Sequence, residues 1–478
     1  MKILIINPPY YIPIIREGRC QSSQNMRKTS IPQMTLAYLA GIHGRGGHTL
    51  KVYDCIASGI TNEDLFMDMD EFQPEAAFIN TVTPSINADL LFVEAFKKRY
   101  PGCFTVVFGT HVTVLHQEMM NKNSFIDCVI RHEPEWASQE LISALQDGRV
   151  PDEGIHGCTM RVNGKVIVSS DREYNPDLDS LGFPAWEYFD KSRYFHPIFN
   201  KPYVMVSASR GCVHNCIFCV GYLYYGKKVR FRSIASVIDE LENHVIGKFG
   251  IRHVWMHADD FTCSPEYVKK LCKAIIERKI KIKWWTNTRV DKRDEEMFQL
   301  MRDAGCFMLS IGGESGNAQI LKMIKKGTKP EHIKDTVKLL RKVGISSLVY
   351  FLIGLPGETL KTIQETLNFA KEINPDYVEF YPATPYPGTE FFDMVRAKNL
   401  IVDVNWDNYM TGGSQFVIET PGMKKEKLDK IIRKAYREFY LRPAYAWILF
   451  KRALRPAEFL RLMSFGFGYF RRFLSSEN

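Results

Sequence analysis

Residues 203–219 read YVMVSASRGCVHNCIFC and place three cysteines directly after a short apolar run. The run Tyr203–Ala208 has the length and composition of a buried strand. Cys212, Cys216 and Cys219 follow it with the spacing C-x3-C-x2-C. Three thiolates on one tight loop can hold three irons of a [4Fe-4S] cluster and leave the last iron open, whereas electron-transfer ferredoxins ligate every iron with cysteine. The stretch therefore predicts a strand that ends in a cluster-binding loop with an open iron.

A zinc site and a chance grouping are the two alternatives for these cysteines. Structural zinc usually takes four Cys or His ligands, and although His214 lies inside the loop, no matching pair stands elsewhere at zinc-finger spacing. The remaining eight of the 11 cysteines are scattered singly in a chain far longer than the small secreted proteins that are rich in disulfides. Zinc is thus the second interpretation.

The strand before the cysteines opens a series of strand and helix units in residues 196–410. Apolar residues at helical spacing, as in Ile234–Val245 and Ile333–Leu340, separate the strands. Six such units indicate a parallel sheet curled into a partial (βα)6 barrel, with functional residues at the carboxyl ends of its strands. The candidate strands are Tyr203–Ala208, His253–His257, Lys283–Asn287, Phe307–Ile311, Leu348–Ile353 and Tyr377–Tyr381.

A separate series of short apolar runs alternates with amphipathic segments in residues 1–150. This pattern is typical of a doubly wound parallel sheet, which binds ligands at the carboxyl ends of its strands. Residues 151–195 turn polar and proline-containing, so we interpret them as a connector. Residues 411–478 form a helical extension. The candidate strands of the first series are Ile3–Ile6, Leu50–Tyr53, Ala76–Ile79, Thr105–Phe108 and Cys128–Ile130.

Composition limits the partners of the chain. Its 478 residues exceed what one core usually supports, in agreement with two domains and an extension. The net charge of +9 is spread along the chain rather than gathered in one stripe, so we expect no nucleic-acid partner. No apolar stretch is long enough to cross a membrane, and the first apolar run is cut short by Pro8 and Pro9, which predicts a cytoplasmic protein.

The end of the chain, from Arg442 to Asn478, mixes arginines and lysines with many aromatic residues. Such a segment can lie in an anionic membrane surface, which predicts peripheral contact with the inner face of the membrane. The alternative is a tail that packs on the barrel and leaves its arginines in solvent.

The cysteine loop and the motifs after it resemble the radical S-adenosylmethionine (SAM) superfamily over residues 200–390. His257–Phe261, Thr286–Arg289, Gly312–Gly316 and Ile353–Thr359 match the family's strand-end motifs in the expected order. The resemblance implies that Cys212, Cys216 and Cys219 hold a [4Fe-4S] cluster whose open iron chelates SAM. It also implies reductive cleavage of SAM to a 5′-deoxyadenosyl radical. The residues it implies as SAM contacts are Phe218, Asp260, Arg289, Glu314 and Gly354.

The N-terminal series resembles the cobalamin-binding domain of cobalamin-dependent radical SAM enzymes. Thr110, and His132 with Pro134, depart from the glycines and the glycine-glutamate run that are common there. The cobalt-ligating D-x-H-x-x-G pattern is absent, so we expect no histidine as lower ligand of the cobalt. The alternative is an α/β cap that binds no cofactor and only shapes the substrate cavity. The residues that the resemblance implies as cobalamin contacts are Thr81, Thr83, Gly109, His111 and Glu133.

These resemblances imply a cobalamin-dependent methyltransferase that methylates an unreactive carbon of a small-molecule or lipid substrate. They also imply an external one-electron reductant of the flavodoxin or ferredoxin type. A cyclase, an oxidase or a rearrangement enzyme would use the same two domains, and a non-catalytic iron–sulfur binding protein is the alternative outside enzymes. No motif identifies a catalytic acid, base or radical relay.

Overall fold

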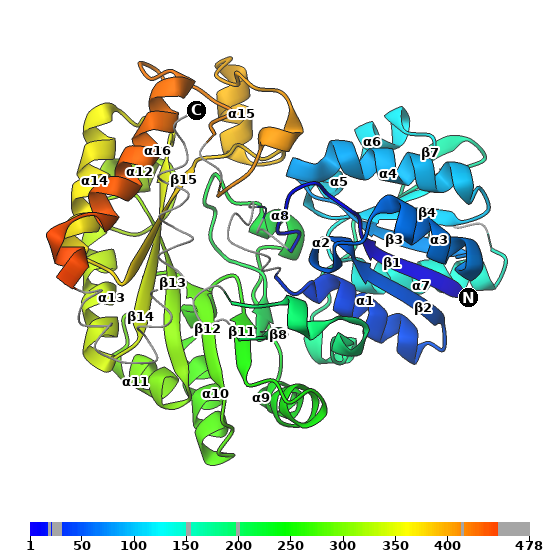
Figure 1. The fold of residues 1–478 in the computed structure, drawn as a ribbon, viewed down its shortest axis with the longest axis horizontal. Coiled ribbons are helices and arrows are strands. Elements are labelled where there is room, and N and C mark those ends of the chain that lie inside the picture. The colour runs from blue at the N-terminus through cyan, green and yellow to red at the C-terminus, as the bar shows by residue number, and fades with distance from the viewer. Residues whose placement is uncertain (18–20, 22–30, 150–153, 197–200, 413–414, 448–478) are drawn as a thin grey trace.

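The computed structural model describes residues 1–17, 21, 31–149, 154–196, 201–412 and 415–447. Two large sheets dominate it, one near the N-terminus and one in the middle of the chain. In Figure 1 the first sheet and its helices, coloured blue to cyan, lie beside the second sheet, coloured green to yellow. The short helix α8 (Gly221–Tyr225) lies between them.

The first sheet has the strand order β2-β1-β3-β4-β5-β6-β7, and β1 to β5 run parallel. Ile3 and Ile5 of β1 join one apolar core, whereas Leu4 and Ile6 join the other, because successive side chains leave a strand on opposite faces. Helices therefore cover both faces, and the predicted doubly wound sheet is confirmed. The strands are β1 (Lys2–Asn7), β2 (Thr49–Asp54), β3 (Ala76–Asn80), β4 (Phe104–Phe108), β5 (Cys128–Ile130), β6 (Cys158–Val162) and β7 (Lys165–Val168).

The helices of this unit divide between the two cores. Helices α1 (Met34–Arg45) and α7 (Pro134–Gln146) pack on one face of the sheet. The other face is covered by α3 (Asn62–Phe72), α4 (Ile86–Arg99) and α6 (His116–Lys122). Glu17 accepts hydrogen bonds from the backbone N–H of Thr35 (3.1 Å) and from its hydroxyl (2.7 Å), so a buried carboxylate caps the start of α1. Two short helices, α2 (Cys55–Ser58) and α5 (Thr110–Val114), complete the unit.

The stretch that we interpreted as a connector begins with a hairpin that belongs to the first sheet. Strand β6 pairs antiparallel with β5, and β7 pairs antiparallel with β6. The turn between them has Asn163 at φ 50° and Gly164 at φ 79°, the positive φ pair that an Asn-Gly hairpin turn requires. The connector interpretation did not include this hairpin, because the local turn signal prevails over the polar composition. After the hairpin the chain passes through three 3₁₀ turns, η2 (Leu178–Leu181), η3 (Trp186–Tyr188) and η4 (Lys191–Arg193).

The second sheet has the order β15-β14-β13-β12-β11-β8, and all its neighbouring strands are parallel. The predicted six-stranded partial barrel is confirmed, with helices along its outer side (Figure 1). Its strands are β8 (Val204–Ser207), β11 (His253–His257), β12 (Lys283–Thr288), β13 (Cys306–Glu314), β14 (Ser346–Ile353) and β15 (Tyr377–Pro382). Its helices are α9 (Ile234–Asp239) with the π-helical η5 (Glu240–Lys248), α10 (Pro265–Glu277), α11 (Glu295–Asp303), α12 (Ala318–Met323), α13 (Pro330–Val343) and α14 (Leu360–Ile373). A small ladder joins β9 (Ser209–Arg210) to β10 (Arg230–Phe231).

The described part of the C-terminal extension packs on the barrel. Helix α16 (Lys425–Tyr440) lies against β15, the last strand of the sheet. The Tyr436 hydroxyl donates to the Phe380 carbonyl (3.1 Å), and the Tyr440 hydroxyl donates to the Val378 carbonyl (2.7 Å). These contacts satisfy backbone groups that a free strand edge would leave unpaired. Of the tail Arg442–Asn478, for which we weighed membrane contact against packing, the structure describes residues 442–447. There Arg442 donates to the Lys371 carbonyl (2.7 Å) and the Tyr445 hydroxyl donates to the Asp376 carbonyl (3.1 Å), so this part packs on the barrel. Residues 448–478 lie outside the described part, and membrane contact stays a prediction. No helix in the described part is long and apolar enough to cross a membrane.

Candidate functional site

The three predicted cluster cysteines lie on one loop between β9 and α8. Cys216 is buried, and Cys212 and Cys219 are half-buried. The N–H of Cys212 donates to the Gly226 carbonyl (3.1 Å), and the N–H of Gly221 donates to Cys219 Sγ (3.3 Å). Gly211 opens the loop at φ 93°, where a Cβ would lie 2.2 Å from the Lys228 carbonyl oxygen, so no other residue fits this turn.

Two of the predicted SAM residues reach this loop from the ends of neighbouring strands. Arg289, just after β12, places Nη1 3.5 Å from Cys216 Sγ. Its backbone N–H donates to Asp260 Oδ1 (3.2 Å), and Asp260 Oδ2 lies 3.7 Å from His214 Nε2 in the cysteine loop. Burial alone would raise the pKa of Asp260, but the hydrogen bonds from His214 and Arg289 and the charges of both lower it overall. The carboxyl is therefore an anion beside the cysteines, and the Arg289 guanidinium brings a positive charge to Cys216.

A buried ion pair continues this network to β13. Lys326 Nζ lies 2.7 Å from Glu314 Oε1, and both side chains are nearly inaccessible to solvent. Glu314 adopts φ 62°, an unusual conformation for a residue other than glycine. Arg289 Nη2 donates to the Lys326 carbonyl, which connects the pair to the cysteine loop.

Gly354 and Phe218 are the other predicted SAM residues. Gly354 follows β14 at φ 90°, and its N–H donates to Glu358 (2.7 Å), which also accepts the Leu355 N–H (3.0 Å). Phe218 is half-buried and packs against the main apolar core. Hydrogen bonds connect Asp260 to Arg289, and Arg289 is connected to Glu314 through Lys326. Gly354 and Phe218 have no part in this network as far as the described residues show.

At the edge of the first sheet the structure brings four of the predicted cobalamin residues together. The Thr81 hydroxyl donates to the Phe108 carbonyl (2.9 Å), and a Cβ on Gly109 would lie 1.9 Å from the Thr81 carbonyl oxygen. His111 Nδ1 lies 3.3 Å from Thr83 Oγ1. These residues follow β3 and β4, beside the point where the strand order reverses, which is the usual ligand position of such sheets.

His111 is fully enclosed at this edge. Burial lowers its pKa to about 3, so the imidazole is neutral at physiological pH. Its ring meets Trp406 of η7 (Trp406–Asn408) edge-on, with centroids 5.1 Å apart. Its Nε2 is buried and has no hydrogen-bond partner among the residues that the structure describes.

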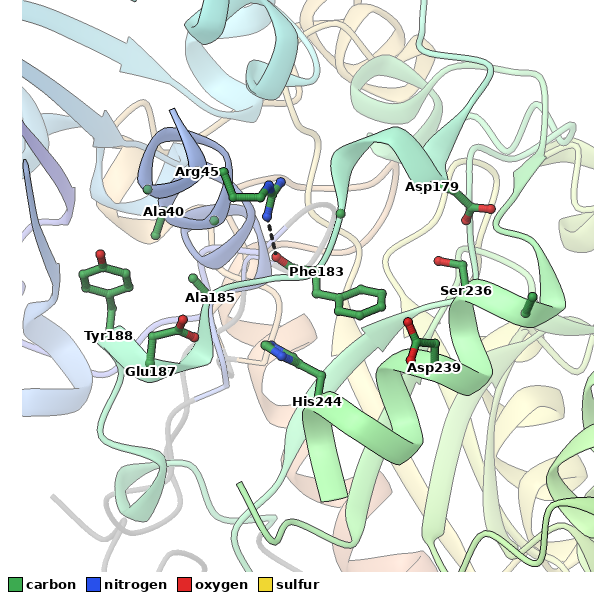
Figure 2. Close-up of a pocket in the computed structure, with 14 residues that line it drawn as sticks. Ala40, Arg45, Asp179, Phe183, Ala185, Glu187, Tyr188, Ser236, Asp239 and His244 are labelled. Atoms are coloured by element: carbon green, nitrogen blue, oxygen red, sulfur yellow. Dashed lines mark hydrogen bonds between the residues drawn. The ribbon is translucent and has the colours of Figure 1, made fainter. Parts of the chain in front are cut away.

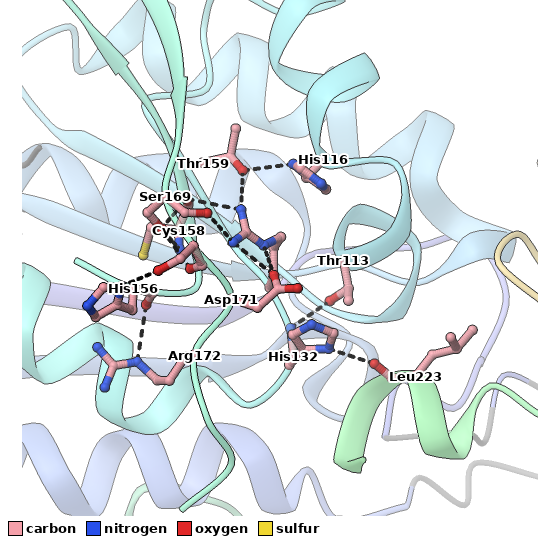
Figure 3. Close-up of polar contacts among 12 residues, drawn as sticks. Thr113, His116, His132, His156, Cys158, Thr159, Ser169, Asp171, Arg172 and Leu223 are labelled. Carbon is pink, nitrogen blue, oxygen red and sulfur yellow. Dashed lines mark hydrogen bonds and ion pairs between the residues drawn. The ribbon is translucent and has the colours of Figure 1, made fainter. Parts of the chain in front are cut away.

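Glu133, the remaining predicted cobalamin residue, lies at the contact between the two units. Its oxygens accept two hydrogen bonds from Arg230 (2.8 and 2.9 Å), and Arg210 Nη1 lies 3.4 Å away. Arg210 also donates to Glu135 (2.7 Å), and His132 Nδ1 donates to the Leu223 carbonyl of α8 (2.7 Å; Figure 3). The loop after β5 thus contacts the chain on both sides of the cysteine loop. It binds Arg210 before Cys212 and Leu223 after Cys219.

These contacts between the loop after β5 and the residues beside the cysteine loop were not predicted from the sequence. A signal for it exists, since Arg210 directly precedes the cysteine loop and two glutamates, Glu133 and Glu135, stand together after β5. Charged residues that close to buried strands usually have a partner, but a single sequence does not identify which one.

A separate cavity of about 850 Å³ lies between α1 and α9. Figure 2 shows Arg45 directed to the Phe183 carbonyl, and His244 Nε2 donates to the Pro184 carbonyl (2.8 Å). None of the predicted site residues lines this cavity.

Comparison with known proteins gives matches over most of the chain. Residues 206–370 match the model of the radical SAM superfamily. An uncharacterised methyltransferase of Pyrococcus horikoshii is 32% identical over 93% of both chains. The anaerobic magnesium-protoporphyrin IX monomethyl ester cyclase of Rubrivivax gelatinosus is 26% identical over 93% of this chain and 78% of its own length.

Among solved structures, the radical SAM methyltransferase TsrM of Kitasatospora setae, with cobalamin and a [4Fe-4S] cluster bound, has the same fold. It superposes with a TM-score of 0.72 at 17% identity and covers 93% of this chain and 89% of its own. The cobalamin-dependent SAM radical enzyme OxsB gives a TM-score of 0.64 at 16% identity, over 86% of this chain and 56% of its own.

Proposed function

Because this chain belongs to the radical SAM superfamily, we propose that it is a cobalamin-dependent methyltransferase acting on an unreactive carbon of a small-molecule or lipid substrate. One observation carries the proposal: the loop after β5 of the first sheet forms hydrogen bonds on both sides of the cysteine loop, which belongs to the unit of the second sheet. A cofactor at the edge of the first sheet and one on the cysteines would therefore be held in a fixed relation. Methyl transfer to a substrate radical needs such an arrangement.

The residues of the cysteine loop fit a [4Fe-4S] cluster. Three thiols stand on one loop that turns at Gly211, and Arg289 brings a positive charge to Cys216. The radical SAM family implies this cluster and SAM as cofactors. We assign Cys212, Cys216 and Cys219 as cluster ligands and Phe218, Asp260, Arg289, Glu314 and Gly354 as SAM contacts.

The edge of the first sheet fits cobalamin in its chemistry. Among the residues that the structure describes, none binds the buried Nε2 of His111, so a polar ligand could supply that hydrogen bond, and Gly109 lets the backbone approach closely. We assign Thr81, Thr83, Gly109 and His111 to this ligand. Glu133 forms an ion pair with Arg230, so a contact of Glu133 with cobalamin would come in addition to that ion pair.

When bound, the cluster and SAM supply a carbon-centred radical, and cobalamin supplies a carrier for the methyl group. The chain's own residues bind and orient these groups. The Lys326 ammonium pairs with the buried Glu314 side chain (2.7 Å) and holds it in place. Glu133 and Glu135 pair with Arg230 and Arg210, which holds the two units in a fixed relative position.

Anaerobic reconstitution with iron, sulfide and hydroxocobalamin tests the assignment. We expect about four irons and one cobalt per chain, and, with a reductant, 5′-deoxyadenosine from SAM. Methyl-labelled SAM should add the label to the product. The Cys216→Ala variant should lose the cluster but keep cobalt, because its substitution lies away from the first sheet.

A cyclase is the second candidate, since the cyclase of Rubrivivax gelatinosus matches 93% of this chain. A product that has lost hydrogen and gained no label would establish it. Iron without cobalt would refute the assignment of the first sheet.

A further inference from the structure

The outer side of the cysteine loop reaches the surface. Val213 is 56% exposed, and Asn215 is also exposed. Each of these residues is next to a cysteine in the sequence. Solvent or a partner protein can therefore contact residues that directly adjoin the cysteines in the sequence.

A first segment beside this loop carries exposed cations. The N–H of Cys212 donates to the Gly226 carbonyl (3.1 Å), and Lys227 and Lys228 follow directly. Lys227 Nζ lies 5.1 Å from the centre of the Tyr222 ring, in the helix that follows Cys219. Both lysines are thus anchored by their backbone next to the first cysteine.

Two further segments also contact the cysteine loop and carry exposed cations. His214 Nε2 lies 3.9 Å from Asp291, and exposed Lys292 and Arg293 follow that aspartate. The N–H of Ile217 donates to the Ile324 carbonyl (3.2 Å). Exposed Lys322 stands two residues before Ile324 in the sequence, and exposed Lys329 stands five residues after it.

We name these six exposed cations the basic set: Lys227, Lys228, Lys292, Arg293, Lys322 and Lys329. None of them has an ion-pair partner within the described residues, whereas nearby Lys325 pairs with Glu390 (2.6 Å). Unpaired cations of one sign attract an acidic partner and steer its approach.

We propose that the exposed edge of the cysteine loop and the basic set form the docking surface for an acidic one-electron donor protein of the flavodoxin or ferredoxin type. The inference rests on the proposed function, because only a redox group on the cysteines needs such a donor. The step moves one electron from the donor to that group, and the donor is oxidised by one electron. No bond forms and no proton is transferred.

Binding of oxidised flavodoxin, followed by the flavin fluorescence, tests this surface directly. Two charge reversals, Lys227→Glu/Lys228→Glu and Lys292→Glu/Arg293→Glu, sample separate segments, so a folding defect in one leaves the other informative. The matched control is Lys273→Glu/Lys338→Glu, two exposed lysines on the outer helices α10 and α13 that have no ion-pair partner in the part of the chain that the structure describes.

We expect each reversal of the basic set to raise the Kd for flavodoxin about tenfold at low ionic strength. The difference should shrink at high salt, because charges more than about 10 Å apart are screened at 0.1 M. The control should bind like the wild type. With dithionite in place of flavodoxin, all variants should form 5′-deoxyadenosine at the wild-type rate.

The proposed docking surface would be overturned if both charge-reversal variants bound flavodoxin with the wild-type Kd. It would also be overturned if the control variant weakened binding as much as they do. A different result concerns the proposed function: no 5′-deoxyadenosine from the wild type with dithionite, while flavodoxin binding still depends on the basic set, refutes the radical chemistry and leaves the surface standing.

Discussion

Replacing Glu133 by glutamine should loosen the contact between the two units at the cysteine loop. The carboxylate accepts two hydrogen bonds from Arg230 and lies 3.4 Å from Arg210, and all three side chains are at most 10% exposed. Glutamine keeps the shape but removes the charge. Glu135 then remains paired with Arg210, whereas the buried Arg230 guanidinium loses the carboxylate that it binds.

The expected cost follows from this geometry. Removing one partner of a buried ion pair costs about 3–5 kcal/mol. The lower end applies here, because Arg210 keeps Glu135 and Arg230 keeps the carbonyls of Asn175 and Tyr225. About 3 kcal/mol corresponds to roughly a hundredfold rise in the equilibrium population of the opened contact.

Hydrogen exchange measured by mass spectrometry checks this value. Peptides that span residues 207–231 should exchange up to about a hundred times faster in Glu133→Gln, while peptides from α13 should not change. The exposed Glu173→Gln substitution is the matched control. Adding Arg230→Met removes the charge left unpaired and should restore part of the protection. The reasoning would be refuted if hydrogen exchange were unchanged in Glu133→Gln. It would also be refuted if the loss of protection in the double variant equalled the sum of the losses caused by Glu133→Gln and Arg230→Met alone.

Two further predictions concern stability. Burial raises the pKa of Glu358 from 4.5 to about 8, so the folded protein retains a proton that the unfolded chain releases. Its contribution to stability is therefore fully present below about pH 4.5 and is lost as the pH rises to about 8, with a slope of at most ~1.4 kcal/mol per pH unit. Denaturant unfolding of Glu358→Gln should show a flatter pH dependence than the wild type, and equal slopes would contradict the raised pKa. Gly109→Ala should cost at least about 2 kcal/mol, because it combines φ 126° with a Cβ 1.9 Å from the Thr81 carbonyl oxygen. Gly102→Ala, where a Cβ meets no atom within 4 Å, is its control, and similar unfolding midpoints for the two would show that the close approach relaxes freely.

The sequence predicted the strands well because their apolar runs are buried on both faces and bounded by turns. β5 (Cys128–Ile130) and β11 (His253–His257) have the predicted bounds. The hairpin β6–β7 was missed because its strands are partly exposed at the sheet edge, where composition carries a weak signal.

The candidate site was predictable in its parts but not in its connections. Local motifs located the cysteine loop and the strand-end residues such as Asp260 and Arg289. The contacts of Glu133 with Arg230 join residues 97 positions apart, and that pairing depends on how two finished units pack together. A single sequence contains no direct record of such packing.

The cover of the first sheet's edge has a consequence for how the protein is made. The Asn87 side chain donates to Asn405 (3.0 Å), 318 residues later in the chain, next to the Trp406 that meets His111. A ribosome adds about 5–20 residues per second, so about 15 to 60 seconds pass between synthesis of the edge and synthesis of its cover. During that interval Trp406 does not yet exist to shield His111. The edge of the first sheet therefore lacks this part of its cover until the segment around Trp406 has been made.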